Sequence, residues 1–190
     1  MKHFIKAIAF ITLMIVCLQA TAQTQEEMKR WMDYSTPSDV QKMIAKADGD
    51  WDEDLSFWMA PGAPEMKMKA ACTNKMILGG RYQEAKHTGD FQGMPFEGIS
   101  TLAWDNLLKK FVTTWIDNMG TGMMVMEGKW DEATKSANFT GKMTDPMAGK
   151  EINVRQVLTI VDDNTQELDQ YQEKDGKEFK AMHIRLTRKK

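Results

Sequence analysis

Apolar and polar residues alternate along most of the chain, starting near Gly49 and continuing almost to its C-terminus. In the first such run, Trp51, Leu55 and Phe57 are separated from one another by acidic or hydroxyl residues. An alternation with a period of two is typical of a β-strand with one face in the core. About ten such runs follow one another, joined by short links rich in turn-forming residues.

These runs predict a mainly β protein in which residues 49–190 form a single antiparallel domain. An open meander would leave two exposed edge strands, and closing it removes both. We therefore expect an up-and-down β-barrel of about ten strands, with a two-sheet sandwich as the alternative. The expected strands are 51–59, 66–72, 76–87, three strands within 89–128, then 136–143, 151–161, 166–173 and 178–188.

Before the strands, apolar residues recur at helical spacing, which predicts one or two helices in residues 23–48 that cap the barrel. Thr36-Pro37 is expected to supply the N-cap and first position of the second helix, and Gly49 its end. The apolar positions are Met28, Trp31, Met32, Val40, Met43, Ile44 and Ala47.

The first 22 residues have the features of a signal peptide. Lys2 and Lys6 precede an apolar run, 7–18, that is too short to span a membrane, and Ala20-Thr21-Ala22 is typical of a cleavage site. We expect cleavage after Ala22 and a periplasmic or secreted protein. The alternative is a lipoprotein modified at Cys17.

The remaining chain has a slight excess of acidic residues, because the whole sequence has a net charge of −2 and the signal segment carries two lysines. This balance argues against a nucleic-acid partner and a polybasic membrane anchor. Cys72 is the one cysteine after the cleavage site, so no internal disulfide is expected.

Several short motifs resemble domain-of-unknown-function family 1579. They are Leu78 to Tyr82, Gly98 to Asp105, Thr114 to Asp117 and Met119 to Gly122, and the resemblance extends over about 39–188. The family has no assigned activity, so the resemblance implies no catalytic residues.

Gly49-Asp50-Trp51, placed after a helix and before the strands, is similar more weakly to calycin and lipocalin-like barrels. In lipocalins a late arginine packs over that tryptophan. The resemblance implies that Arg185 or Arg188 makes this cation–π contact.

If the barrel is hollow, one set of residues would line a ligand cavity. Phe111, Trp115 and Asp117 share one face of a strand, because alternate residues point the same way. Asp117 would orient a ligand or, as we favour, cap the turn that follows it. Arg81, on the third strand, would bind an anion if it points inward. The candidate ligand-binding residues are Arg81, Trp104, Phe111, Trp115, Asp117 and Met124.

The sequence predicts no metal site and no cofactor. The methionines from Met119 to Met126 suit Cu(I) by chemistry, but neighbours on a strand point to opposite faces, so core packing is favoured. His183 has the chemistry of a haem ligand and His87 that of a zinc ligand, but a packed polar role is favoured for both, because no cluster of further ligands accompanies either histidine. Cys72 has little support as a nucleophile.

Three functions remain open. The leading hypothesis is a non-enzymatic protein that binds a small apolar or amphipathic ligand inside the barrel. The alternatives are an enzyme that uses Arg81 and Asp117 in the interior, and a scaffold or interaction protein with a solid core. Apolar residues on both faces of the strand after Gly122 suggest a homodimer.

Overall fold

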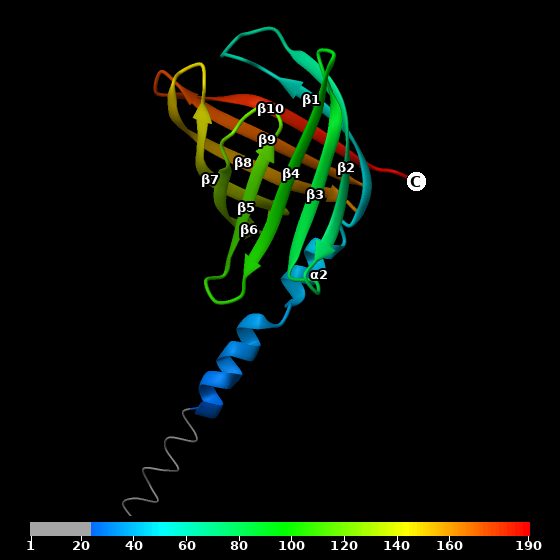
Figure 1. Cartoon of the computed structure of the whole chain (residues 1–190), viewed down its shortest axis with the longest axis vertical. Helices are drawn as coiled ribbons and strands as arrows, with labels where there is room; N and C mark the ends of the chain where they lie inside the picture. Colours follow the sequence, from blue (N-terminus) through cyan, green and yellow to red (C-terminus); the bar gives the residue numbers. More distant parts are fainter. Residues whose placement is uncertain (1–23) are drawn as a thin grey trace, which may run out of the picture. The chain divides into compact units, whose positions relative to one another are not determined.

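The computed structural model describes residues 24–190, so the predicted signal peptide lies outside the described residues. Ten antiparallel strands form one closed barrel in which each strand pairs with its neighbours in sequence and β1 pairs with β10 (Figure 1). This confirms the predicted up-and-down barrel over the sandwich. The strands are β1 Gly49–Phe57, β2 Met66–Ile77, β3 Tyr82–Phe91, β4 Met94–Asp105, β5 Lys110–Asp117, β6 Met124–Asp131, β7 Ser136–Asp145, β8 Lys150–Asp162, β9 Thr165–Lys174 and β10 Lys177–Arg188.

One predicted turn is wrong. Residues 73–75 were expected to end the second strand, but β2 continues through them to Ile77. The hairpin turn lies instead at 78–81, where Leu78, Gly79 and Gly80 all have positive φ angles of 50°, 68° and 79°. Two consecutive glycines adopt this left-handed backbone without steric cost, which places the turn there.

Helix α2, Asp39–Ala45, covers the end of the barrel at which β1 begins (Figure 1). Its N-cap is Ser38, not Thr36, because the Ser38 hydroxyl accepts from the Val40 amide and Gln41 completes a capping box. Ile44 is 5 % exposed and belongs to the main apolar cluster inside the barrel. α2 therefore closes this end of the barrel.

The helix ends at Ala45, before the predicted end at Gly49. Gly49 begins β1 with a φ of 121°, and a Cβ there would lie 3.1 Å from Nη1 of Arg188. Glycine is needed at this position because the backbone is left-handed and a side chain from the last strand crosses it.

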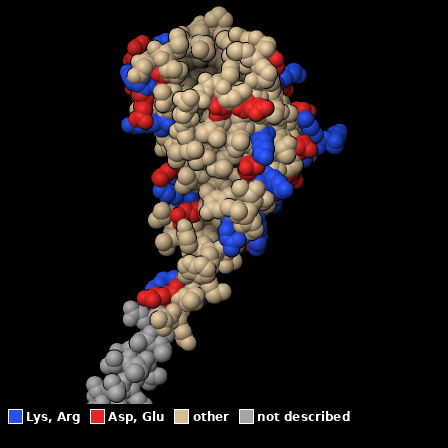
Figure 2. Space-filling view, viewed as in Figure 1, with Lys and Arg blue, Asp and Glu red and all other residues tan. Residues whose placement is uncertain are grey.

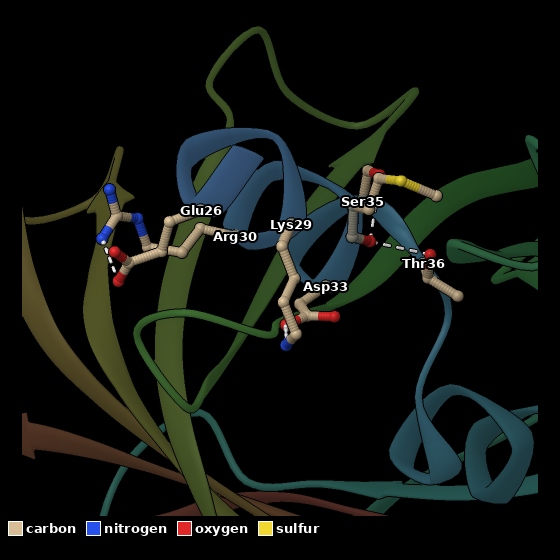
Figure 3. A network of polar contacts seen from close by, with 7 residues as sticks. Glu26, Lys29, Arg30, Asp33, Ser35 and Thr36 are labelled. Atoms are coloured by element: carbon tan, nitrogen blue, oxygen red, sulfur yellow. Dashed lines mark hydrogen bonds and ion pairs between the residues drawn. The ribbon is translucent and has the colours of Figure 1, made fainter. Parts of the chain in front are cut away.

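The segment 24–35 is also helical. It belongs to a separate compact unit that ends at Thr36, whereas α2 and the barrel belong to the unit Pro37–Lys190. Two ion pairs with i, i+4 spacing, Glu26–Arg30 and Lys29–Asp33, lie along it (Figure 3). The Thr36 hydroxyl donates to the Met32 carbonyl at its C-terminal end. In the described part of the chain, no helix has the length and apolar character needed to cross a membrane.

The interior differs between the two ends of the barrel. Near α2 it is solid, with Trp51, Phe111 and Met126 0 %, 2 % and 2 % exposed. At the opposite, open end, the inward-facing side chains are only half-buried, and Figure 2 shows this end hollowed. The half-buried, inward-facing residues are Phe57, Phe91, Phe96, Trp115, Met143, Ile152 and Met182.

Candidate functional site

Two of the predicted ligand-binding residues lie in the solid half of the barrel. Trp104 and Phe111 are cross-strand neighbours whose ring centres are 4.8 Å apart. Phe111 also packs edge-on against Phe139, and the backbone carbonyl of Trp104 accepts from the side-chain amide of Gln41. These contacts give both residues a packing role under α2. Met124 faces inward next to the same cluster and is half-buried.

Arg81 lies in the turn between β2 and β3, outside both strands. Its Nη1 donates to the carbonyl of Leu78 at 3.2 Å, and the residue is exposed. Asp117 ends β5 at the opposite end of the barrel. The structure therefore does not bring together the Arg81–Asp117 pair on which the enzyme hypothesis depended.

Trp115 and Asp117 lie together on the inward face of β5, as the alternation predicted. The indole Nε1 of Trp115 donates to Oδ2 of Asp117 at 2.6 Å, and Oδ1 accepts from the Met119 amide at 2.9 Å. Asp117 thus caps its turn and also orients Trp115. The Trp115 ring lies over Gly98, where a Cβ would come within 2.5 Å of Cη2. The indole fits into the interior because residue 98 of β4 has no side chain.

The edge of the Trp115 ring system meets His87 on β3, with the ring centres 5.0 Å apart. His87 Nδ1 lies 3.1 and 3.2 Å from the two carboxylate oxygens of Glu53 on β1. Its Nε2 lies 3.9 Å from Sγ of Cys72 on β2. The side chains of Glu53 and His87 are 2 % and 13 % exposed, and Cys72 is 2 % exposed. Three neighbouring strands thus hold a carboxylate, an imidazole and a thiol together inside the barrel.

The order thiol, imidazole, carboxylate is also that of a nucleophile with its base and orienting acid. Here the thiol is unsuited to attack. Burial raises the pKa of the Cys72 thiol, and the negative charges of Glu53 and Asp50 raise it further. The Cys72 Sγ–H donates to Oδ1 of Asn74 at 3.1 Å rather than to the imidazole. A neutral, buried thiol at this distance does not supply a thiolate nucleophile.

A second polar group lies across the interior, on β8 and β9. Nε2 of Gln156 donates to Oε1 of Gln170 at 2.7 Å, and both side chains are buried. Gln172 and Gln170 also approach the sulfur of Met143, at 3.5 and 4.0 Å. The interior therefore presents amide and carboxylate groups as well as apolar walls.

An apolar groove of about 330 Å³ lies at the rim of the open end. It is formed by the loop after β1 and by the start of β10 and is lined by Trp58, Ala60, Pro61, Gly62, Phe179 and Lys180. This volume is at the lower limit for pockets that hold a small ligand.

The last histidine faces away from the interior. His183 Nδ1 lies 2.8 Å from Oδ1 of Asp169, which Lys180 also contacts at 2.8 Å. Both residues are on the outer face, because they alternate with inward-facing Ile184 and Leu168. His183 therefore points away from the interior, where a haem inside the barrel would have to be bound. Met123, which precedes the inward-facing Met124, is 61 % exposed, so neighbouring methionines do not converge on one ion.

Glu53 was not among the residues predicted from the sequence, and no partner was predicted for His87. Glu53 stands between Trp51 and Leu55 at positions that all face inward, and a carboxylate in that series was the available signal. Its partners could not be identified from spacing along the chain, because they lie on two other strands. Asn74 was misread as a turn residue, whereas its side chain is buried beside Cys72.

The geometry defines a closed ten-stranded antiparallel barrel with one end sealed by a short helix and the other end open. The family model described as "Protein of unknown function (DUF1579)" matches residues 36–188. The chain belongs to this family.

No curated protein matches the chain. Among solved structures, the crystal structure of Rv2717c from M. tuberculosis is similar, with a TM-score of 0.61 and 9 % sequence identity. The match covers 82 % of this chain and 100 % of that one. At this identity the likeness concerns the fold alone.

Proposed function

We propose that the protein is exported and binds a small apolar or amphipathic molecule, without chemical conversion, in the open half of its barrel. The observation that carries the proposal is the incomplete burial of the inward-facing side chains in that half, where Figure 2 shows the hollow. Inward-facing apolar residues of a solid core would be almost fully buried, as Phe111 and Met126 are.

The lining favours an amphipathic over a purely apolar ligand. Phe57, Phe91 and Trp115 supply apolar and aromatic surface, and Gln172 and Asp117 supply polar atoms on opposite walls. A few polar groups set in an apolar wall are typical of sites that orient small ligands. Asp117 also accepts hydrogen bonds from Trp115 and the Met119 amide, so it fixes the position of Trp115 in this wall.

The test is a titration with a fluorescent fatty-acid analogue, using two variants on the same strand. Met124 faces inward and is half-buried, whereas the outward-facing Val125 is 49 % exposed. Met124→Trp should fill part of the hollow and weaken probe binding by at least about 10-fold, since a site without volume loses its contacts. Val125→Trp adds the same side chain outside and should leave binding unchanged.

Equal binding by both variants, or no binding by the unaltered protein, would favour a solid scaffold. Native mass spectrometry of protein isolated from its own compartment would show a retained molecule and the number of subunits together. Conversion of that molecule on incubation would favour an enzyme. The predicted homodimer is tested by the same spectrum, and the exposed outward-facing Ile99 and Ile116 are where a second copy would pack.

A further inference from the structure

We propose that Glu53, Cys72 and His87 form a binding site for a thiophilic divalent cation of the Zn²⁺ class. Each residue offers one donor atom, and these atoms all lie within 4.8 Å of one another inside the barrel. The inference does not depend on the proposed ligand, since none of the three donor side chains belongs to the proposed ligand lining.

The spacing of the donors is close to what such an ion requires. Zinc binds sulfur, nitrogen and oxygen at about 2.0–2.3 Å, so tetrahedral ligands are roughly 3.3–3.8 Å apart. His87 would bind the ion through one ring nitrogen: its Nδ1 lies 3.1 Å from Glu53, and its other nitrogen, Nε2, lies 3.9 Å from Sγ of Cys72. With one donor atom per residue, all three atoms lie within 4.8 Å of one another, so side-chain rotations that shorten the longest separation by about 1 Å would place the three around one ion.

Asn74 supplies a fourth donor, its amide oxygen, in a fixed orientation. Its Nδ2 donates to the Ala47 carbonyl at 3.2 Å, and a carbonyl can only accept, so the amide oxygen must face Cys72. That oxygen lies 3.1 Å from Sγ. A thiolate beside an amide oxygen would be repelled, whereas a cation between them would be bound by both.

Charge and donor type both favour this class of ion. On binding, the cation displaces the Cys72 proton to solvent, and the resulting thiolate and the Glu53 carboxylate together neutralise the divalent charge, which a site this deeply buried requires. The set of one sulfur, one nitrogen and one or two oxygens suits Zn²⁺ or Co²⁺ and does not suit Mg²⁺ or Ca²⁺, which prefer oxygen alone. His87, the most exposed of the three, is the side through which the ion would enter.

The test is a Co²⁺ titration of the whole chain after treatment with a chelator under reducing conditions. We expect one Co²⁺ per chain with a thiolate-to-cobalt charge-transfer band, displaced by Zn²⁺. Because the Trp115 ring contacts His87, bound Co²⁺ should also quench its fluorescence, and Trp115→Phe should remove that part of the quenching.

Loss of an outer hydrogen-bonding partner costs roughly 10–100-fold in metal affinity, so loss of a direct ligand should cost at least about 100-fold. We expect this loss for His87→Ala and Glu53→Gln, and loss of the charge-transfer band for Cys72→Ser. His183→Ala is the matched control, because His183 also contacts a carboxylate but lies outside the barrel, and it should bind normally.

Circular dichroism and urea midpoints establish that each variant is folded, and Cys72→Ser is close to isosteric. A charge-transfer band that persists in Cys72→Ser, or an unaltered protein that binds no Co²⁺ with such a band, would overturn the proposal. So would loss of binding in His183→Ala alone. None of these outcomes bears on the fluorescent-probe titration, so the two proposals fail separately.

Discussion

The guanidinium carbon of Arg188 lies 4.3 Å from the ring centre of Trp51, which is completely buried. Nη1 and Nη2 of the same arginine donate to the carbonyls of Asp48 and Lys46, at 2.7 and 2.6 Å. One side chain on the last strand therefore covers the first strand and satisfies carbonyls just after α2. Of the two arginines that the resemblance to lipocalin-like barrels offered, the structure selects Arg188.

Arg188→Lys should destabilise the protein by about 2 kcal/mol. A lysine reaches one carbonyl instead of three, because Nε of Arg188 also donates to the Asp163 carbonyl at 3.1 Å, and it loses the planar stacking on Trp51. Arg185→Lys is the control, because Arg185 pairs with Glu167 on the outer surface, where the side chain of Arg185 is 50 % exposed. The control should change stability by less than about 1 kcal/mol. Urea unfolding of both variants measures the difference, and equal losses would contradict the role given to Arg188.

Trp115 and Asp117 should be energetically coupled. Removing the carboxylate by Asp117→Ala leaves the indole N–H without its 2.6 Å acceptor, and a bond to a charged group contributes roughly 1.5–3 kcal/mol. In a double-mutant cycle, Trp115→Phe should remove most of this penalty, giving a coupling energy of about 1 kcal/mol or more. Strict additivity of the two losses would show that the bond contributes nothing in solution.

Gly98→Ala should push the Trp115 ring away from β4. The added methyl would meet Cη2 at 2.5 Å, and overpacking of this kind costs about 1–3 kcal/mol. At Gly120 a Cβ would have no neighbour closer than 3.9 Å, so Gly120→Ala should be nearly neutral. A shift of tryptophan emission in the first variant and not in the second would confirm that Trp115 has moved.

The outer cluster around Asp169 should give stability that is lost in acid. Burial alone would raise the pKa of Asp169, but hydrogen bonds from Lys180 and His183 outweigh it and hold the pKa below the ordinary 3.8. A lowered folded-state pKa stabilises the protein above pH 3.8, and the contribution disappears as the pH falls through the folded value.

Asp169→Asn should therefore lower stability at neutral pH and make the acid limb of the stability curve shallower. Asp54→Asn is the control, because Asp54 is 65 % exposed and lies 3.4 Å from Lys69, so its effect should be small at every pH. Urea midpoints between pH 2 and 7, a range set around the carboxyl pKa, compare the two. Parallel curves for Asp169→Asn and the unaltered protein would contradict the assignment.

The alternation of side chains allowed much of the fold to be predicted. The period of two placed Phe111, Trp115 and Asp117 on one inward face, and the removal of edge strands favoured a closed barrel. The cap on the turn after Asp117 also followed from the known preference of aspartate. These features depend on neighbours in sequence or on a rule that applies to every strand.

Other features could not be predicted because they depend on which strands become neighbours and with what register. Glu53, Cys72 and His87 are joined only by the pairing of β1 with β2 and of β2 with β3. Asn74 was predicted to be a turn residue, so the next strand was predicted to begin at residue 76 and to include Arg81. The buried side chain of Asn74 instead hydrogen-bonds Cys72 and the Ala47 carbonyl, which keeps this part of β2 extended. A shift of one residue in the predicted register would have turned Glu53, Cys72 and His87 from the inner to the outer face of their strands.

The pairing of β1 with β10 has a consequence for how the chain folds during synthesis. Each of the other strands pairs with the strand before it, but β1 lacks its second partner until the last strand is made. Contacts between the two ends of a chain form slowly, because the segment between them is the longest loop that folding has to close. Arg188 meets Trp51 only at that last step, so a nascent chain that still lacks β10 stays open along one seam, with two unpaired edges for a chaperone to recognise.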